Sequence, residues 1–293
     1  MEQLQEKSIV FPNLDITLYD VGDHVDIFGF PVMYYGIIIA VGMLLAGFII
    51  LHEGRRVGFS EDDLLDVLLW GIVCGIIGAR VYYVVFAWDR YSDNLFSIFN
   101  IREGGLAIYG GMIGCLLAVI VVAARRKLEF FALADCIILG VPIGQAFGRW
   151  GNFFNREAFG GYTNGLLAMR LPVSAVRQDD AVTSEMMDHL ITENGIRWIQ
   201  VHPTFLYESM WSCVVFLILY FIIRRKKKWD GEVFFWYLLL YGSGRFLIEA
   251  LRTDQLLLPY LGLPVSQCLS ALLVTVSIAI IVYNSLLTKD VRF

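Results

Sequence analysis

Residues 131–160 read FALADCIILGVPIGQAFGRWGNFFNREAFG, an apolar run that ends in arginine, asparagine and glutamate side chains. The run up to Trp150 is long enough to cross a bilayer, because a membrane-spanning helix needs about 20 predominantly apolar residues. Arg149 therefore lies at the end of a predicted membrane helix. An arginine near the centre of such a helix costs roughly 2.5 to 3.5 kcal/mol, so membrane arginines usually face a cavity and meet an anion. At this depth the natural anion is a lipid phosphate.

Apolar runs of similar length recur along the whole chain. Hydrophobic residues make up 57% of its 293 residues, a composition typical of membrane proteins with several spans. We predict an all-α polytopic membrane protein with about seven transmembrane helices and a small extracytoplasmic head domain. The predicted spans are residues 31–51, 64–87, 106–124, 131–150, 205–223, 233–251 and 265–287.

Basic residues gather after the first, third, fifth and seventh predicted spans. They are Arg55 and Arg56, residues 125–127, residues 224–228, and Lys289 with Arg292. Cytoplasmic loops of membrane proteins carry such an excess of lysine and arginine. We therefore predict that the N-terminus lies outside and the C-terminus in the cytoplasm. We interpret these runs as topological anchors, which predicts a lipid bilayer as partner and no nucleic acid.

The predicted spans divide the chain into four parts. Residues 1–30 form an extracytoplasmic N-terminal segment, 31–151 the first four helices, 152–203 the head, and 204–293 the last three helices with a cytoplasmic C-terminus. Residues 16–28 alternate between apolar and polar types, which is typical of a short strand or a surface-lying segment. No basic segment precedes the first apolar run, so we expect that run to be a retained span rather than a signal peptide.

The predicted fourth helix carries a stripe of small residues. Gly140, Gly144 and Gly148 recur every four residues. Small residues at this spacing allow the backbone of another helix to approach closely. We therefore expect close helix packing along this stripe.

Two predicted helices carry polar side chains along one face. These side chains are Gln145, Arg149 and Asn152 on the fourth predicted helix, and Tyr241, Arg245, Glu249 and Arg252 on the sixth. We expect Glu249 to pair with Arg245 and with Arg252, because pairing lowers the cost of burying charges. A purely structural salt-bridge ladder is the alternative for Glu249 and Arg252. Arg245 lies deeper, and we interpret it as an anion ligand.

Three further side chains lie at a similar depth. Arg80 belongs to the second predicted span, Tyr35 to the first and Tyr109 to the third. Each tyrosine can alternatively be an ordinary aromatic residue at the membrane interface. Arginine suits phosphate because its planar fork donates two charge-assisted hydrogen bonds. An arginine-rich site without metal-ligand spacing therefore predicts the binding of an anionic phospholipid, with no metal.

Four separated motifs carry a resemblance to a known family. They are GRWGNFFNREAFGG at 148–161, REGGLAIYGG at 102–111, HPTFLYE at 202–208 and YGSGRFLIEALRTD at 241–254. In this order, and over most of the chain, they resemble the prolipoprotein diacylglyceryl transferases. The resemblance implies transfer of the diacylglyceryl group of phosphatidylglycerol to the thiol of the lipobox cysteine in a prolipoprotein signal peptide. It further implies a thioether product, release of glycerol phosphate, no cofactor, and a place in the bacterial cytoplasmic membrane.

The resemblance also assigns residues, by motif. It implies catalytic roles for Arg149, Arg245 and Glu249, and phosphatidylglycerol binding by Arg149, Arg245, Asn152, Tyr35, Tyr241, Glu157 and Gly160. We add Arg80 to the predicted lipid-binding residues because of its depth in the second span, and Tyr109 to the predicted catalytic residues because of its position in the second motif. Many family members have histidine, often proposed as general base, where this chain has Tyr109. A phenol with an ordinary pKa near 10 is a poor base for a thiol with a pKa near 8.5. The proton acceptor can therefore be Tyr109 with a pKa lowered by nearby arginines, the lipid phosphate, Glu208, or solvent with Arg245 stabilising the thiolate. We favour the last alternative, with Tyr109 hydrogen-bonding the lipid headgroup.

Three other classes of protein compete with this interpretation. An anion or lipid transporter could use the same buried arginines, although inverted repeats typical of transporters are not evident. An intramembrane serine protease would use a motif such as Gly242-Ser243-Gly244, together with a histidine inside a neighbouring span. A metal-dependent phosphatidyltransferase would need clustered aspartates.

Overall fold

The computed structural model describes residues 6–101, 104–177 and 181–290. Arg102, which opens the second motif, and Arg292 lie outside the described residues. The chain divides into two compact units. The first unit joins the chain up to Ala46 with the chain from Ile138 onward, and the second unit is Gly47–Ile137.

The structure contains a helix at each of the seven predicted spans. They are α1 (Tyr34–Val57), α2 (Glu61–Phe86), α3 (Ile108–Arg126), α4 (Phe130–Asn155), α6 (Thr204–Leu217), α8 (Glu232–Glu249) and α9 (Val265–Asp290). Helix α6 continues through a π-helical turn, Ile218–Ile223, into α7 (Arg224–Lys226). Six candidate spans in the described residues are long and apolar enough to cross a membrane. Helix α8 is not among them, because its 18 residues include Glu232, Arg245 and Glu249. The predicted helical, multi-pass membrane fold is confirmed.

Local interactions move several helix ends away from the predicted positions. Strand β4 (Phe30–Met33) pairs with β3 (His24–Ile27), so α1 begins at Tyr34 instead of residue 31. Helix α2 begins earlier than predicted because the side chain of Ser60 accepts a hydrogen bond from the backbone of Asp63, a typical N-terminal cap. Helix α4 runs on to Asn155, so the signature is helical from Gly148 to Asn155.

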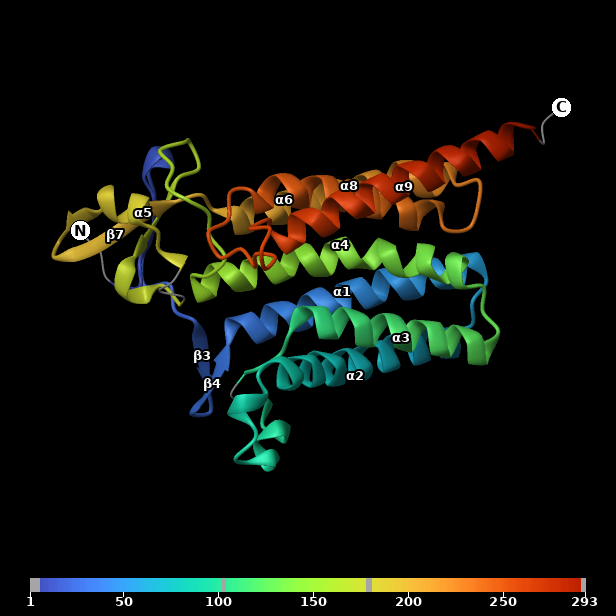
Figure 1. Cartoon of the computed structure of the whole chain (residues 1–293), viewed down its shortest axis with the longest axis horizontal. Coiled ribbons are helices and arrows are strands. Elements are labelled where there is room, and N and C mark those ends of the chain that lie inside the picture. The colour runs from blue at the N-terminus through green and yellow to red at the C-terminus, as the bar shows by residue number, and fades with distance from the viewer. Residues whose placement is uncertain (1–5, 102–103, 178–180, 291–293) are drawn as a thin grey trace. The chain divides into compact units, whose positions relative to one another are not determined.

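The extramembrane head is built on a five-stranded antiparallel sheet, which the all-α prediction did not include. Its strand order is β2-β1-β5-β7-β6. The strands are β1 (Ile9–Phe11), β2 (Ile16–Leu18), β5 (Met169–Pro172), β6 (Ile191–Glu193) and β7 (Ile196–Val201). A short helix, α5 (Ser184–Asp188), lies between β5 and β6 in the chain. Because β1 pairs with β5 at Val10 and Arg170, the N-terminal segment and the segment after α4 form one sheet. Figure 1 shows these strands at one end of α4, α6 and α8.

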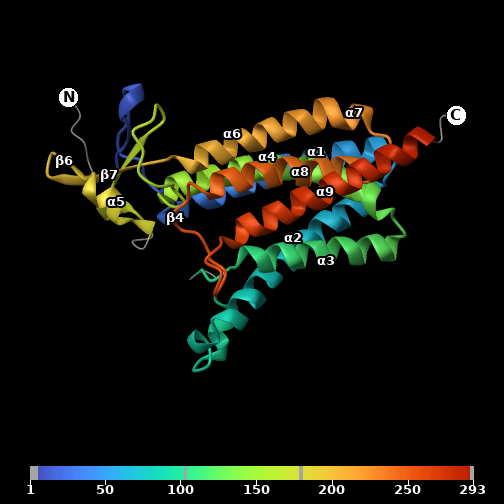
Figure 2. The ribbon, with the colours of Figure 1, turned by 45° about the horizontal axis from the view of Figure 1, so that its top comes forward.

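The core of the head continues into the helices of the first unit. Phe153 of α4 and Phe205 of α6 are buried in the same cluster as Ile9, Phe159 and Ile199. The ring centroids of Phe153 and Phe205 are 4.9 Å apart. The head therefore holds the end of α4 next to the start of α6. Figure 2 shows α4, α6, α8 and α9 running alongside one another.

Arg156, inside the signature, fixes the N-terminal segment to the head. Its side chain is 7% exposed. Its Nη2 donates to the backbone carbonyls of Lys7, at 2.8 Å, and Val21, at 2.5 Å. A buried guanidinium is stable only when its donors find acceptors. This arginine is therefore committed to the protein backbone.

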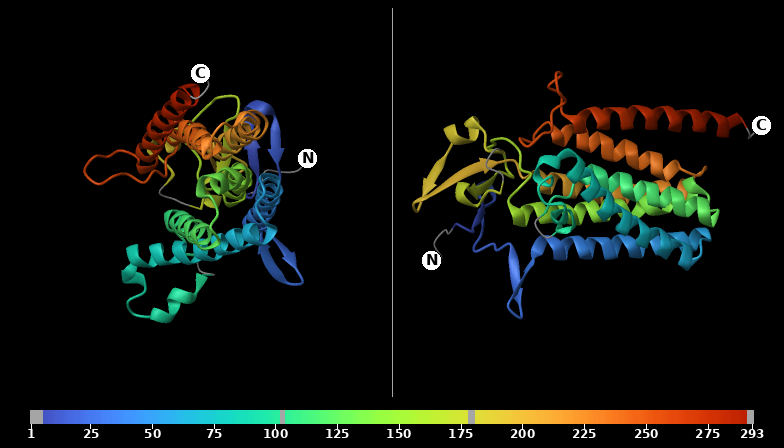
Figure 3. Two further views of the ribbon diagram at one scale, coloured as in Figure 1. Left: turned by 90° about the vertical axis from the view of Figure 1, so that its right-hand side faces the viewer. Right: turned by 60° about the horizontal axis from the view of Figure 1, so that its bottom comes forward.

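The second unit is dominated by the close pairing of α2 and α3. A methyl group added at Gly114 would lie 2.2 Å from the carbonyl oxygen of Cys74, and one added at Gly110 would lie 2.3 Å from that of Gly78. In contrast, a methyl group at Gly144 or Gly148 would meet no atom within 4 Å. Helix α1 nevertheless approaches the stripe at Gly144, because a methyl group added at Gly42 would lie 3.7 Å from the Cα of Gly144. The predicted close approach of another helix is therefore found at Gly144 and not at Gly148. Figure 3 shows residues 87–101 extending beyond the ends of α2 and α3.

We expect the Gly114→Ala substitution to lower the melting temperature of the purified protein by several degrees. The added methyl group would force α2 and α3 apart, and overpacking a close contact costs about 1 to 3 kcal/mol. Gly111→Ala is the matched control, since its methyl group would meet Gly75 and Ala79 at 3.5 and 3.6 Å, ordinary contact distances. Equal melting temperatures for the two variants would contradict the close approach at Gly114.

Candidate active site

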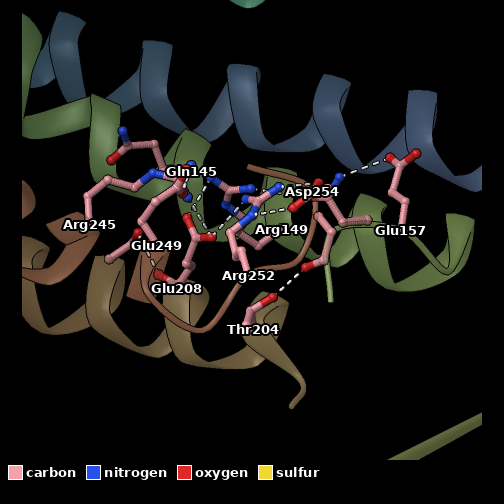
Figure 4. Close-up of polar contacts among 12 residues, drawn as sticks. Gln145, Arg149, Glu157, Thr204, Glu208, Arg245, Glu249, Arg252 and Asp254 are labelled. Atoms are coloured by element: carbon pink, nitrogen blue, oxygen red, sulfur yellow. Dashed lines mark hydrogen bonds and ion pairs between the residues drawn. The ribbon is translucent and has the colours of Figure 1, made fainter. Parts of the chain in front are cut away.

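Three arginines from separate parts of the chain meet at one carboxylate, that of Glu208. Arg149 Nη2 lies 2.5 Å from Glu208 Oε2, Arg245 Nη1 lies 2.9 Å from Oε1, and Arg252 Nη1 lies 3.2 Å from Oε1. Glu208 is buried, with 6% of its surface exposed. Figure 4 shows the three guanidinium groups around this side chain.

The packing of α6 against α8 places Glu208 in this position. Trp211 Nε1 donates to the carbonyl of Leu240 at 3.0 Å. The indole reaches α8 because residue 244 is glycine, where an added methyl group would lie 2.0 Å from Trp211 Nε1. Residues three apart share a helix face, so Glu208 faces α8 as Trp211 does. It therefore meets Arg245, the residue after Gly244.

Two more carboxylates complete what we call the arginine–carboxylate cluster: Arg149, Glu208, Arg245, Glu249, Arg252 and Asp254. Arg245 Nη2 lies 2.6 Å from Glu249 Oε2, as the sequence predicted. Arg252 differs from the prediction, because it pairs with Asp254 and Glu208 instead of Glu249. The three arginines and three carboxylates have equal and opposite formal charges.

The arginines of the cluster differ in how firmly they are held. Arg252 makes two parallel hydrogen bonds to Asp254, at 2.9 and 2.7 Å. Burial raises the pKa of Asp254, but the hydrogen bonds and charge of Arg252 outweigh burial and hold that pKa below its ordinary value. Arg149 contacts one carboxylate, Glu208, and donates a longer bond of 3.3 Å to Asn152 Oδ1. Arg149 is therefore the least constrained guanidinium of the three.

The signature residues Asn152 and Glu157 are joined to each other. Asn152 Nδ2 donates to Glu157 Oε1 at 2.9 Å, and Asn155 Nδ2 donates to the same oxygen at 3.0 Å. Arg177 Nη1 lies 3.6 Å from Glu157 Oε2. Glu157 thus orients the amide of Asn152, which in turn accepts from Arg149. The structure brings these predicted site residues together.

Gly160 acts through its backbone. Its N–H donates to the carbonyl of His202 at 2.9 Å, and the N–H of His202 donates back to Gly161 at 3.0 Å. Gly161 donates in turn to Leu251 at 2.9 Å. These bonds join the end of the signature to the segments that precede α6 and follow α8. Gly160 therefore has a structural role, and its contact with lipid stays a prediction.

Three tyrosines, from α1 and α8, lie near the signature and the cluster. Tyr241 stacks on Tyr237 with ring centroids 5.4 Å apart. Gln145 Nε2 donates to the Tyr237 hydroxyl at 2.8 Å, so α4 and α8 also meet one turn from Arg149 on α4 and two turns from Arg245 on α8. Tyr35 packs on Gly151, where an added methyl group would lie 2.5 Å from its ring. Tyr35 therefore lies beside the signature, and Tyr241 lies one turn before Arg245 of the cluster.

Arg80 and Tyr109 belong to the second unit. Arg80 is 7% exposed. Its guanidinium donates to five backbone carbonyls of the segment between α2 and α3, those of Ser97, Ile98, Asn100, Gly104 and Gly105. A guanidinium has five N–H donors, so this arrangement argues against the predicted binding of lipid phosphate by Arg80. Tyr109 lies in the first turn of α3.

Comparison with known proteins identifies the family. The model of the prolipoprotein diacylglyceryl transferase family matches residues 24–283. The chain belongs to the prolipoprotein diacylglyceryl transferase family. A phosphatidylglycerol–prolipoprotein diacylglyceryl transferase of Clostridioides difficile strain 630 is 45% identical over 232 residues, which cover 79% of this chain and 83% of the relative.

Two further relatives cover more of this transferase. Both have the same name as the first. The Finegoldia magna protein is 40% identical over 262 residues, which cover 89% of this chain and 92% of the relative. The other relative is from Bacillus cereus strain G9842. The Bacillus cereus protein is 40% identical over 277 residues, which cover 92% of each chain. The family resemblance predicted from the four motifs is confirmed.

Two residues of the arginine–carboxylate cluster, Glu208 and Asp254, are not among the site residues predicted from the sequence. Glu208 was named as one possible proton acceptor, and Asp254 was the last residue of a quoted motif. A charged residue near the start of an apolar span was a usable signal for Glu208. Asp254 gave no comparable signal, because it follows α8 in a loop.

The structure also bears on the competing classes. The Ser243 hydroxyl donates to the carbonyl of Leu239, 2.7 Å away on its own helix, so the partial protease motif lies inside α8 with its hydroxyl bonded to backbone. In residues 6–101, 104–177 and 181–290, no group of three or more His, Cys, Asp or Glu side chains is arranged to hold a metal ion.

We expect Gly160→Ala to abolish most of the transferase activity. The added methyl group would lie 2.6 Å from the Leu251 carbonyl and 2.8 Å from His202 Cβ, so the segments carrying Arg252 and Glu208 would have to separate. A misplacement of about 1 Å can cost about 100-fold in rate. Gly161→Ala is the control, because its methyl group would meet no atom within 4 Å. Similar activities for both variants would refute the backbone role of Gly160.

Proposed function

We propose that this protein transfers the sn-1,2-diacylglyceryl group of phosphatidylglycerol to the lipobox cysteine of prolipoprotein signal peptides. This is the first step of bacterial lipoprotein maturation. The observation that carries the proposal is the buried convergence of Arg149, Arg245 and Arg252 on a single anion position, at Glu208. Membership of the family and the names of the relatives supply the identity of the two substrates.

The chemistry of the cluster suits this reaction. The cysteine sulfur attacks the glyceryl carbon, the bond from that carbon to the phosphate oxygen breaks, and negative charge accumulates on the departing glycerol phosphate. Donors fixed in a water-poor site stabilise such charge without reorganising. Arg149 and Arg245 bind the phosphate through planar forks, and Arg252 is held in place by Asp254.

The surrounding residues receive supporting roles. Asn152 hydrogen-bonds the lipid headgroup, and Glu157 orients its amide through the 2.9 Å bond. Tyr35 and Tyr241 line the lipid site, and Glu249 positions Arg245. The motif resemblance alone assigns Tyr109 a role in the reaction.

We also propose how the chain lies in the membrane. Arg224, Arg225 and Lys226 follow the apolar part of α6, at the opposite end of that helix from Glu208. Positive residues favour the cytoplasmic side. The cluster and the head then lie at the outer leaflet of the bacterial cytoplasmic membrane, with residues 1–30 and 152–203 outside and the C-terminus in the cytoplasm.

The direct test uses purified protein in vesicles that contain phosphatidylglycerol and a lipobox peptide. We expect a thioether-linked diacylglyceryl peptide and an equal amount of released glycerol phosphate. Vesicles of phosphatidylcholine alone are the control, and they should yield no product. Anion flux across the vesicle membrane without any lipidated peptide would instead favour a transporter.

We expect Arg149→Lys to lower the rate of diacylglyceryl transfer by about 100-fold although charge is kept. An ammonium group cannot reproduce the two-pronged contact of a guanidinium with phosphate. Arg177→Lys is the matched control, because the Arg177 side chain is 61% exposed and meets Glu157 only at 3.6 Å. Near-normal transfer by Arg149→Lys would exclude the bidentate role.

A further inference from the structure

We propose that Glu208 is both the resident anion of the cluster and the acceptor of the cysteine thiol proton. The lipid phosphodiester displaces Glu208 from the arginines, and the displaced carboxylate then takes the proton. This inference rests on the proposed function and assigns its missing general base. The position of Tyr109 in place of a histidine leaves that role open in this chain.

Competition for the same donors is the first step. The arginine atoms that contact Glu208 are Arg149 Nη2, Arg245 Nη1 and Arg252 Nη1. These groups converge on two oxygens within one carboxylate, which is the arrangement that a phosphodiester with two free oxygens requires. A lipid phosphate that enters the cluster must therefore replace Glu208 at one or more of these contacts.

The charge balance supplies the second step. The cluster holds three arginines and three carboxylates, so it is formally neutral. The phosphodiester adds one negative charge, and a cysteine thiolate would add another. Two unbalanced negative charges in a water-poor site are strongly unfavourable. Transfer of the thiol proton to a carboxylate of the cluster removes one of them.

The contacts single out Glu208 among the three carboxylates. Asp254 is held by two parallel bonds from Arg252. Glu249 pairs with Arg245 within one helix, four residues away. Glu208 instead is held by three arginines from other segments, and two of these, Arg245 and Arg252, also pair with another carboxylate. Glu208 therefore loses the most ion pairs when the arginines bind phosphate instead. A carboxylate that loses cationic partners binds a proton more tightly.

Charged side chains face Glu208 from three segments. Arg149 faces it from α4, Arg245 from α8, and Arg252 from the segment after α8. Among the described residues, Glu249, Asp254 and the phenol of Tyr241 lie close to these arginines. His202 lies near the start of α6, where its Nδ1 is 3.2 Å from the Tyr207 hydroxyl. A phenol is protonated at neutral pH, so it must first lose its own proton.

The proposed steps conserve atoms and electrons. The thiol proton moves to Glu208, and the sulfur lone pair forms the new carbon–sulfur bond. The electrons of the broken carbon–oxygen bond stay on the phosphate oxygen, which leaves glycerol phosphate as a dianion. Glu208 then passes its proton to this phosphate, whose second pKa is about 6, and returns to the arginines.

The test compares Glu208→Gln with the unchanged protein in nanodiscs. Two measurements are made: binding of a phosphonate analogue of phosphatidylglycerol, in which the bond to be cleaved is carbon–carbon, and the pH profile of kcat. We expect the analogue to bind as tightly or more tightly, because one negative charge is gone, while kcat falls about 100-fold or more. The acidic limb of the wild-type profile should disappear, and residual activity should rise with pH up to the thiol pKa near 8.5.

Two controls separate proton transfer from charge and from folding. Glu249→Gln removes a negative charge from the same cluster but should keep the acidic limb. Glu208→Asp keeps a carboxylate and should restore the limb at a reduced rate. Transfer by the unchanged protein is measured first, so failure of the proposed function is recognised before the variants are compared.

Three results would overturn the assignment. One is a Glu208→Gln variant that keeps the acidic limb. Another is loss of analogue binding in Glu208→Gln together with failure of Glu208→Asp to restore the limb, which would make Glu208 purely structural. The third is loss of the limb in Tyr109→Phe instead, which would make the phenol the base.

Discussion

Burying three guanidinium groups among membrane helices is possible only because their charges and donors are satisfied at one place. Glu208 contacts all three, from α4, α8 and the segment that follows α8. Removing one partner of a buried ion pair costs about 3 to 5 kcal/mol, because the other charge is then uncompensated. The mutual positions of these segments in the first unit therefore depend on Glu208, as does the geometry with which the arginines face a ligand.

Much of the remaining structure of the first unit serves to deliver Glu208 to this point. Gly244 leaves room for Trp211, which turns the corresponding face of α6 toward α8. The backbone bonds of Gly160 and Gly161 join the end of the signature to His202 and Leu251, just before α6 and just after α8. The signature glycine is therefore needed for the site even though its contacts are with protein backbone. The signature thus combines Arg149 and Asn152, to which we assign the lipid, with Gly160, which organises the backbone around them.

The sequence predicted the features that depend on one segment at a time. Apolar runs placed the helices, and helical spacing placed Arg149 with Asn152 and Arg245 with Glu249. Features that depend on distant partners were missed. A buried arginine such as Arg80 needs hydrogen-bond acceptors. The sequence around it does not tell whether these are phosphate oxygens or backbone carbonyls, and in the structure they are backbone carbonyls. The pairing of β1 with β5 was missed for the same reason, because a strand's partner is not encoded in its own pattern.

The equal number of acids and bases in the cluster has a consequence for turnover. Three unpaired arginines would bind glycerol phosphate, a dianion at the moment of its release, more tightly than the monoanionic lipid, and product would be trapped. Under the proposed proton transfer, Glu208 becomes an anion again when the phosphate is protonated. It then competes for Arg149, Arg245 and Arg252 against a product that carries less charge. The same carboxylate that yields to the substrate thus helps to expel the product, and this explains why an active site for an anion contains as many carboxylates as arginines.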